Sequence, residues 1–267
     1  MAQKRRKRKN KIKLINYICP GCDSIWENKA TLQRIRCPFC NEIIKWGKKK
    51  EEAWPIPDEK YDLFKKILVE SSREKERKRN LVLFQLGIAT GYRLGDLVEL
   101  KIGDILTAIE KGKFCIDENK KYKAWQTNEW KKESERLKGK KVKSKNPPRP
   151  REAMIRPNLK AILIEYCKGK KRSEYAFKSS TRSEKHIEAG TFSKKLTEIS
   201  KDKRLNLTHI TGHSLRKTYA TRMYESTGNV EYVKDALGHA DVRTTYLYLR
   251  LGKKEIEKGT EYIDQKL

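Results

Sequence analysis

Residues 211–248 read TGHSLRKTYATRMYESTGNVEYVKDALGHADVRTTYLY, and this stretch indicates the fold most clearly. Glycines at 212, 228 and 238 punctuate it, which predicts helices over 213–225, 229–237 and 241–250. His213 and Arg216 are three residues apart, so in a helix they share a face of the first turn. The C-terminal part of the chain is therefore predicted to be helical, with two polar side chains together at one helix start.

A histidine and an arginine at a helix start form a natural anion site. The free N–H groups and the positive end of the helix dipole attract a phosphate, and a guanidinium matches two phosphate oxygens. Taken alone, the motif fits a surface helix with a capping serine better than an anion site. Two further segments point to the same pocket: His239 and Tyr248 follow nine residues apart, and ATGYRLGDL at 89–97 supplies Arg93 upstream.

The set Arg93, His213-x-x-Arg216, Gly238-His239 and Tyr248 resembles the signature of the phage integrase, or tyrosine recombinase, family over residues 89–248. The resemblance implies a mainly helical fold with a small antiparallel sheet (α+β). It also implies that Arg93 and Arg216 clamp the oxygens of a DNA phosphate while Tyr248 attacks the phosphorus and is joined to the 3′-phosphate. His213 would exchange a proton with the tyrosine and His239 would hydrogen-bond the phosphate, with no metal or nucleotide needed for the chemistry.

The family also uses a lysine on a strand hairpin as the acid for the departing 5′-oxygen. Lys143, in the Lys143-Ser-Lys145 segment, resembles that pattern, and Lys141 and Lys145 remain alternatives. Asp96 is expected either to hold Arg93 by a hydrogen bond or to cap a helix. Tyr246 is a less suitable nucleophile, because residues two apart point to different helix faces.

Apolar spacing predicts further helices over 59–70, 80–90, from 94 to 100, 158–166 and 191–201. Short strands are expected near 102–109 and 113–117. Residues 120–151 are strongly basic, contain Trp125 and Trp130 and end among prolines, so we expect a long loop or hairpin extension there.

Four of the six cysteines form two Cys-Pro-x-Cys pairs, Cys19 with Cys22 and Cys37 with Cys40. Each turn would point two thiolates at one ion, and four thiolates make a closed tetrahedral site that stabilises a module too small for its own core. The pattern predicts a zinc ribbon with one structural Zn²⁺, against the alternative of four unrelated buried cysteines.

Lys and Arg number 64 against 35 Asp and Glu, a formal net charge of +29, which favours a polyanionic partner. Without a long apolar run or signal segment we expect a soluble, intracellular protein, either cytoplasmic and nucleoid-associated or encoded by a virus or mobile element. The expected organisation is a basic arm (1–13), the zinc ribbon (14–47), a linker (48–57) and the catalytic domain (58–267).

The sequence before residue 58 offers no room for the helical core-binding domain that usually precedes this catalytic domain, which puts site selectivity in question. The resemblance implies a site-specific recombinase or integrase that acts on double-stranded DNA as a homotetramer on paired sites. Two alternatives remain open: an inactive zinc-ribbon regulator with the same fold, and a type IB-like topoisomerase.

Overall fold

A computed structural model describes most of the chain: residues 14–18, 22, 24–29, 34–41, 43–45, 52–138, 141, 143, 146–182, 184–249, 251 and 260–266. The arm expected at 1–13 and the first part of the linker, 48–51, lie outside these residues. The chain divides into two compact units, Met1–Glu51 and Glu52–Leu267. Among the described helices, none has the length and apolar character of a membrane span.

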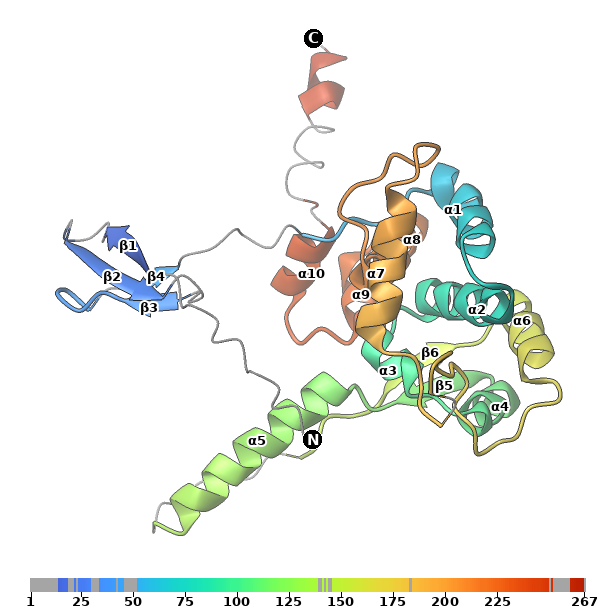
Figure 1. The fold of residues 1–267 in the computed structure, drawn as a ribbon, viewed down its shortest axis with the longest axis horizontal. Helices are drawn as coiled ribbons and strands as arrows, with labels where there is room; N and C mark the ends of the chain where they lie inside the picture. The colour runs from blue at the N-terminus through green and yellow to red at the C-terminus, as the bar shows by residue number, and fades with distance from the viewer. Residues whose placement is uncertain are drawn as a thin grey trace, which may run out of the picture. The chain divides into compact units, whose positions relative to one another are not determined.

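The first unit contains two small antiparallel hairpins (Figure 1). Strand β1 (Leu14–Ile18) pairs with β2 (Ile25–Lys29), and β3 (Arg34–Arg36) pairs with β4 (Ile43–Lys45). Each hairpin places described cysteines beside a strand end: Cys22 lies between β1 and β2, and Cys37 and Cys40 follow β3 directly. The two halves of the cysteine pattern are therefore presented by two successive hairpins.

The second unit is mainly helical and carries one antiparallel pair of strands (Figure 1). Strand β5 (Lys113–Ile116) pairs with β6 (Arg151–Met154). The helices before β6 are α1 (Asp58–Glu70), α2 (Glu74–Thr90), α3 (Leu94–Val98), α4 (Ile102–Lys111) and α5 (Asn119–Arg136). Those after it are α6 (Pro157–Cys167), α7 (Ala189–Ser200), α8 (Gly212–Thr227), α9 (Val230–Leu237) and α10 (Val242–Leu249). The predicted fold class, mainly helical with a small sheet, is confirmed.

Two local predictions were wrong. The strand expected at 102–109 is helix α4, whose buried Ile102, Ile105 and Ile109 follow helical spacing, and Asp104 accepts a hydrogen bond from the backbone N–H of Lys101 at its start. The loop expected at 120–151 is for the most part helix α5, which has no buried residue. Because α5 lacks an apolar stripe, periodicity gave no signal for it.

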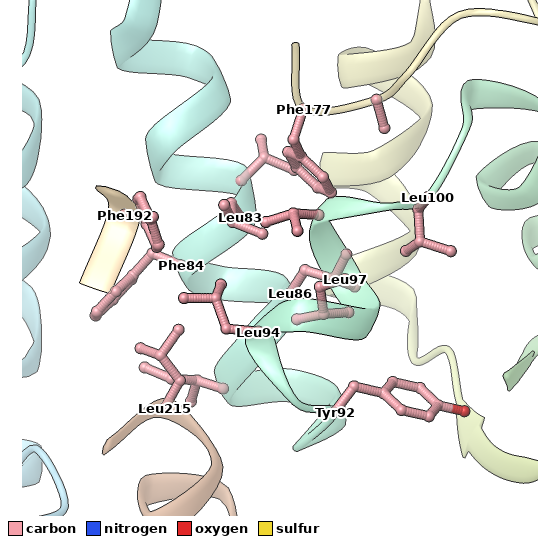
Figure 2. Close-up of a cluster of buried hydrophobic side chains, with 14 of the residues drawn as sticks. Leu83, Phe84, Leu86, Tyr92, Leu94, Leu97, Leu100, Phe177, Phe192 and Leu215 are labelled. Carbon is pink, nitrogen blue, oxygen red and sulfur yellow. The ribbon is translucent and has the colours of Figure 1, made fainter. Parts of the chain in front are cut away.

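Helix α2 lies at the centre of the core and packs against α1, α6 and α8. Figure 2 shows its Leu83, Phe84 and Leu86 gathered with residues of α3 and with Phe177, Phe192 and Leu215. At Gly87 a Cβ atom would lie 2.7 Å from Leu215 Cδ1, so the missing side chain helps α2 and α8 to pack closely. This contact fixes the start of α8 against the end of α2.

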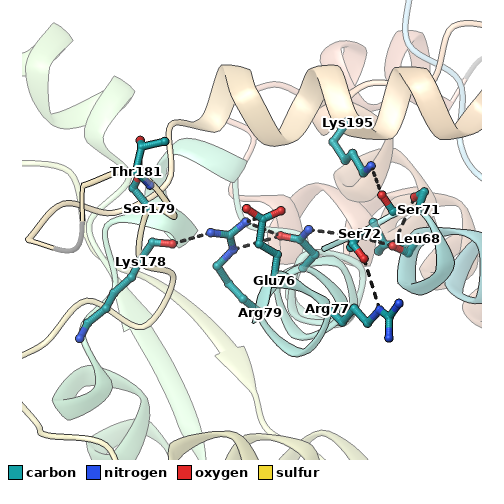
Figure 3. Close-up of polar contacts among 11 residues, drawn as sticks. Leu68, Ser71, Ser72, Glu76, Arg77, Arg79, Lys178, Ser179, Thr181 and Lys195 are labelled. Carbon is teal, nitrogen blue, oxygen red and sulfur yellow. Dashed lines mark hydrogen bonds and ion pairs between the residues drawn. The ribbon is translucent and has the colours of Figure 1, made fainter. Parts of the chain in front are cut away.

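A polar network joins the start of α2 to the segment before α7 (Figure 3). Arg79 donates to the carbonyl oxygen of Lys178 at 2.6 Å and, through Nε, to Asn80 at 3.0 Å. Asn80 in turn donates to Ser72 at 2.9 Å, and Lys195 of α7 donates to the carbonyl oxygen of Ser71 at 2.6 Å. These bonds tie the end of α1 and the start of α2 to α7 and to the segment before it.

Candidate active site

The start of α8 is fixed by its own cap and by two neighbouring helices. The Thr211 hydroxyl accepts from the backbone N–H of His213 at 3.2 Å, and Ser214 Oγ accepts from that of Thr211 at 3.0 Å. The backbone N–H of Gly212 donates to Ser193 Oγ at 2.9 Å, and a Cβ there would lie 2.6 Å from Leu94. His213 and Arg216 therefore project from a rigid helix start.

Arg216 is 1% exposed and donates hydrogen bonds to the ends of two helices. Its Nη1 donates to the carbonyl oxygen of Gly91 at 2.8 Å, and its Nη2 donates to that of Leu237 at 2.7 Å. Gly91 ends α2 in the left-handed conformation (φ 62°), which favours glycine, and its carbonyl faces the guanidinium as a result. The helix ends thus satisfy a buried cation that would otherwise be costly.

Arg93 and Arg216 meet at one carboxylate that the sequence did not single out. Glu118, whose side chain is 1% exposed, places Oε1 2.5 Å from Arg93 Nη1 and 3.0 Å from Arg216 Nη1. Its Oε2 lies 2.8 Å from Lys121 Nζ. Burial alone would raise the pKa of Glu118, but hydrogen bonds from Lys121 and Arg93 and the charge of Arg216 outweigh it and lower the pKa to about 2. Glu118 is therefore ionised and holds the two arginines together.

Tyr248 lies between the two predicted histidines. Its ring centroid is 5.2 Å from that of His213 and 5.5 Å from that of His239, both in edge-to-face geometry. His239 Nδ1 is 2.9 Å from the Thr245 hydroxyl, which fixes the ring. The Tyr248 hydroxyl is buried and has no hydrogen bond of normal geometry among the described residues. Tyr246, by contrast, is 48% exposed and lies on another face of α10.

The titration of these groups follows from burial beside arginines. Burial lowers the pKa of His213 to about 4, and the charges of Arg216 and Lys217 act in the same direction. Burial also lowers the pKa of His239 to about 4, with Arg216 and Arg93 adding to it. The pKa of Tyr248 is raised by burial, although the two arginines oppose the shift. At neutral pH the histidines are neutral and the tyrosine is protonated, so each imidazole has a nitrogen that accepts a proton.

The structure brings together Arg93, His213, Arg216, His239 and Tyr248. Lys143 and Lys141 are exposed, and Lys143 forms no hydrogen bond or ion pair with the part of the chain that is described. Lys145 lies outside the described residues. A different lysine, Lys121, reaches the cluster: its ammonium also donates to the carbonyl oxygen of Gly238 at 2.5 Å, next to His239.

The Asp96 carboxylate forms no hydrogen bond with the Arg93 side chain among the described residues; the only bond between the two residues runs from the backbone N–H of Asp96 to the Arg93 carbonyl oxygen at 2.9 Å. Asp96 is not the N-cap of α3, which is Arg93, but its carboxylate accepts a bond at the start of another helix. Its Oδ1 accepts from the backbone N–H of Asn119 at 3.2 Å, at the start of α5, and its Oδ2 has no hydrogen bond among the described residues. Asp96 therefore fixes the position of the residue next to Glu118.

Arg151 was also missed by sequence reasoning. It is 6% exposed, its Nε donates to the carbonyl oxygen of Ala236 at 2.5 Å, and its guanidinium lies 4.3 Å from the Tyr92 ring centroid. It thus connects β6 to the end of α9, just before His239. The sequence signals were weak: an acidic residue directly after a predicted strand for Glu118, and one arginine among many basic residues for Arg151.

In the first unit the sulfur atoms of Cys22, Cys37 and Cys40 lie within 4.8 Å of one another. The Cys22 and Cys37 sulfurs are 3.7 Å apart, and Cys37 is 1% exposed. Two thiolates on a tetrahedral zinc with Zn–S bonds of about 2.3 Å would be about 3.8 Å apart. The triad therefore fits a metal ion, while Cys19, the predicted fourth ligand, lies outside the described residues.

The profile of the phage integrase family matches residues 60–255, well over half of the chain. The chain belongs to this family. Among curated relatives, it is 28% identical to tyrosine recombinase XerA of Pyrococcus furiosus over 198 residues, 74% of this chain and 58% of the relative. It is 28% identical to the probable integrase/recombinase YoeC of Bacillus subtilis over 174 residues, 65% of this chain and 78% of the relative.

Two solved structures confirm the fold. A XerH site-specific recombinase bound to a palindromic difH substrate aligns with a TM-score of 0.54 at 20% identity, covering 80% of this chain and 54% of that one. The XerA recombinase aligns with a TM-score of 0.52 at 18% identity, covering 82% and 67%. The chain thus spans about half the length of several of the relatives it matches.

Proposed function

We propose that this chain is a site-specific DNA recombinase or integrase that cleaves and rejoins DNA through a covalent 3′-phosphotyrosyl intermediate on Tyr248. One observation carries the proposal: the ring of a buried tyrosine packs edge-to-face against two neutral imidazoles, close to a pair of guanidiniums held by one carboxylate. A phosphodiester under attack gains negative charge on its non-bridging oxygens, which these guanidiniums would stabilise. Members of the family are crystallised on DNA, including the XerH complex.

The proposed cleavage step needs only these residues, one lysine and the DNA. Tyr248 Oη forms a bond to phosphorus as the bond from phosphorus to the 5′-oxygen breaks, and the bond energy is kept for rejoining. His213 takes the tyrosine proton, which it can do because it is neutral at physiological pH. His239 donates to the phosphate, and a lysine gives a proton to the departing 5′-oxygen. Glu118 holds Arg93 and Arg216 in position to contact the phosphate.

The proposal is tested with a nicked duplex carrying the recombination site, incubated without metal or nucleotide. A covalent adduct at the 3′ side of the break is the expected result, and no adduct would favour an inactive DNA-binding regulator. Joining between two differently labelled duplexes then separates the recombinase from a topoisomerase, because only paired sites give the hybrid product. The homotetramer on paired sites is part of this proposal, and supercoil relaxation without hybrid product would contradict it.

The departing oxygen needs an acid, and two lysines are candidates. Lys143 has the sequence pattern, whereas Lys121 is favoured by its contacts with Glu118 and Gly238. We expect Lys121→Ala to slow cleavage by about 10²–10⁴-fold, the usual contribution of acid catalysis, and Lys143→Ala to have little effect. Cleavage rates of both variants on a nicked duplex check this.

A substrate whose departing 5′-oxygen is replaced by sulfur provides the control, since a thiolate leaves without protonation. The lysine that acts as acid is identified by a variant whose rate recovers on this substrate. Recovery of the Lys143 variant alone would assign the role to Lys143 and reduce Lys121 to a partner of Glu118. Recovery of neither would point to Lys141 or Lys145.

We further propose that Cys19, Cys22, Cys37 and Cys40 hold one structural Zn²⁺ in a zinc-ribbon module. Because folding of so small a module depends on its metal, we expect one zinc per purified chain and its loss in Cys37→Ser. Cys115→Ser is the matched control, because Cys115 is an exposed cysteine outside the triad and zinc content should not change. A zinc-free chain in which Cys19, Cys22, Cys37 and Cys40 all react with a thiol reagent would contradict the proposal.

A further inference from the structure

Among the described helices α1 to α10 of the second unit, α5 is the one with no buried residue. In Figure 1 it extends away from the other helices of its unit. It stands between β5 and β6 and begins at the polar cluster: Glu118 is its N-cap residue and Lys121 lies in its first turn. Most of its side chains are exposed to solvent, and they begin directly beside the polar cluster.

The exposed residues of α5 are segregated by charge around the helix axis. With 100° per residue, six exposed residues share one sector of about 100° and form what we call the basic face: Lys120, Lys123, Thr127, Trp130, Lys131 and Ser134. The glutamates of the helix, at 129, 133 and 135, all project outside this sector. The half-buried residues Lys121, Trp125, Glu129, Lys132 and Arg136 occupy the other side. The helix therefore presents cations and hydroxyls, with no carboxylate, on one side.

The basic face is continuous with the polar cluster. Lys120 is close enough to His213 for its charge to contribute, after burial and the nearer cations, to the low pKa of that imidazole. From Lys120 to Lys131 the helix rises about 16 Å, which is the length of roughly five base-pair steps along the axis of a duplex. Trp130, 81% exposed, stands between the lysines as a flat apolar surface.

We propose that the basic face of α5 binds the phosphate backbone of duplex DNA leading away from the cleaved bond. The inference rests on the proposed function for the position of that bond, and it extends the interface beyond the cleavage site. Positive charge without an intervening carboxylate fits the regular phosphates of a strand, whereas a protein partner would be expected to meet an apolar stripe. The contact gives the catalytic unit a second DNA-binding surface, on the same helix whose N-cap residue is Glu118.

The test compares two variants that remove the same charge. Lys123→Ala/Lys131→Ala lies on the basic face and leaves Lys120 intact, while Lys160→Ala/Lys168→Ala removes two exposed lysines of α6 and its end. Alanine favours helix, so α5 should keep its structure, which circular dichroism would verify. Binding of a labelled 30-base-pair duplex is measured by anisotropy across a range of NaCl concentrations.

Each lost phosphate contact should reduce the slope of log affinity against log salt concentration by about 0.9, so the α5 variant should lose about 1.8 from the slope. The α6 variant should keep the wild-type slope. An unchanged slope in the α5 variant overturns the inference. Sedimentation of the variant then shows what the basic face does instead: lost self-association would mean that it binds another copy of the chain, and unchanged self-association would mean that it is only solvated. Cleavage by the wild type is scored separately: a reduced slope without any wild-type adduct supports the α5 interface and contradicts the proposed function.

Discussion

Replacing Tyr248 with phenylalanine is expected to abolish the covalent protein–DNA adduct, a loss of at least about 10⁴-fold because no other group takes over the nucleophile's role. The ring would still pack between His213 and His239, since only the buried hydroxyl is removed. DNA affinity should therefore stay within about twofold. Denaturing gels of a nicked duplex whose cleaved strand is labelled at its 5′ end measure the adduct, and anisotropy measures binding.

Tyr246→Phe is the matched control. Tyr246 lies two residues away on the same helix but is 48% exposed and turned to another face, so its hydroxyl should be dispensable for cleavage. An adduct that persists in the Tyr248 variant and disappears in the Tyr246 variant would reassign the nucleophile. Loss of DNA binding by Tyr248→Phe would instead show that the hydroxyl contributes to the fold of α10.

The sequence was sufficient for the parts of the site that depend on local chain geometry. The three-residue spacing of His213 and Arg216, and glycines such as Gly238 that end helices in the left-handed conformation, are local features. Their convergence with Arg93 and Tyr248 was implied by the family resemblance. Most helices were predicted for the same reason, because their apolar spacing is visible in a short window.

Features that depend on long-range packing were not predicted. Glu118 is separated from Arg216 by 98 residues, and only the folded chain shows that it is buried between two guanidiniums. Helix α4 was taken for a strand because β-branched isoleucines favour strands, although their burial follows a helix. Helix α5 has no buried face to create periodicity, so composition indicated a loop.

Replacing Glu118 with glutamine is expected to lower the free energy of unfolding by on the order of 3 kcal/mol at pH 7, because two buried guanidiniums would lose their shared carboxylate. The pKa of Glu118 is lowered to about 2 in the folded chain, and its unfolded value is near 4.5. Ionised Glu118 thus stabilises the fold fully above the unfolded value, and this contribution is lost as pH falls toward 2. Urea unfolding at pH 7, 5 and 3 measures the difference in unfolding free energy between wild type and variant. This difference should become smaller as the pH falls to 3.

Glu152→Gln is the control, since Glu152 forms an ion pair with Lys113 but its side chain is 53% exposed, and such pairs contribute little. If the difference in unfolding free energy between wild type and Glu118→Gln does not change with pH, then Glu118 stabilises the fold through its packing and not through its charge. Cleavage gives an independent measurement: if Glu118 holds Arg93 and Arg216 for the phosphate, the glutamine variant should cleave more slowly even when folded and saturated with DNA. Faster cleavage would show instead that the carboxylate competes with the DNA phosphate for the two arginines.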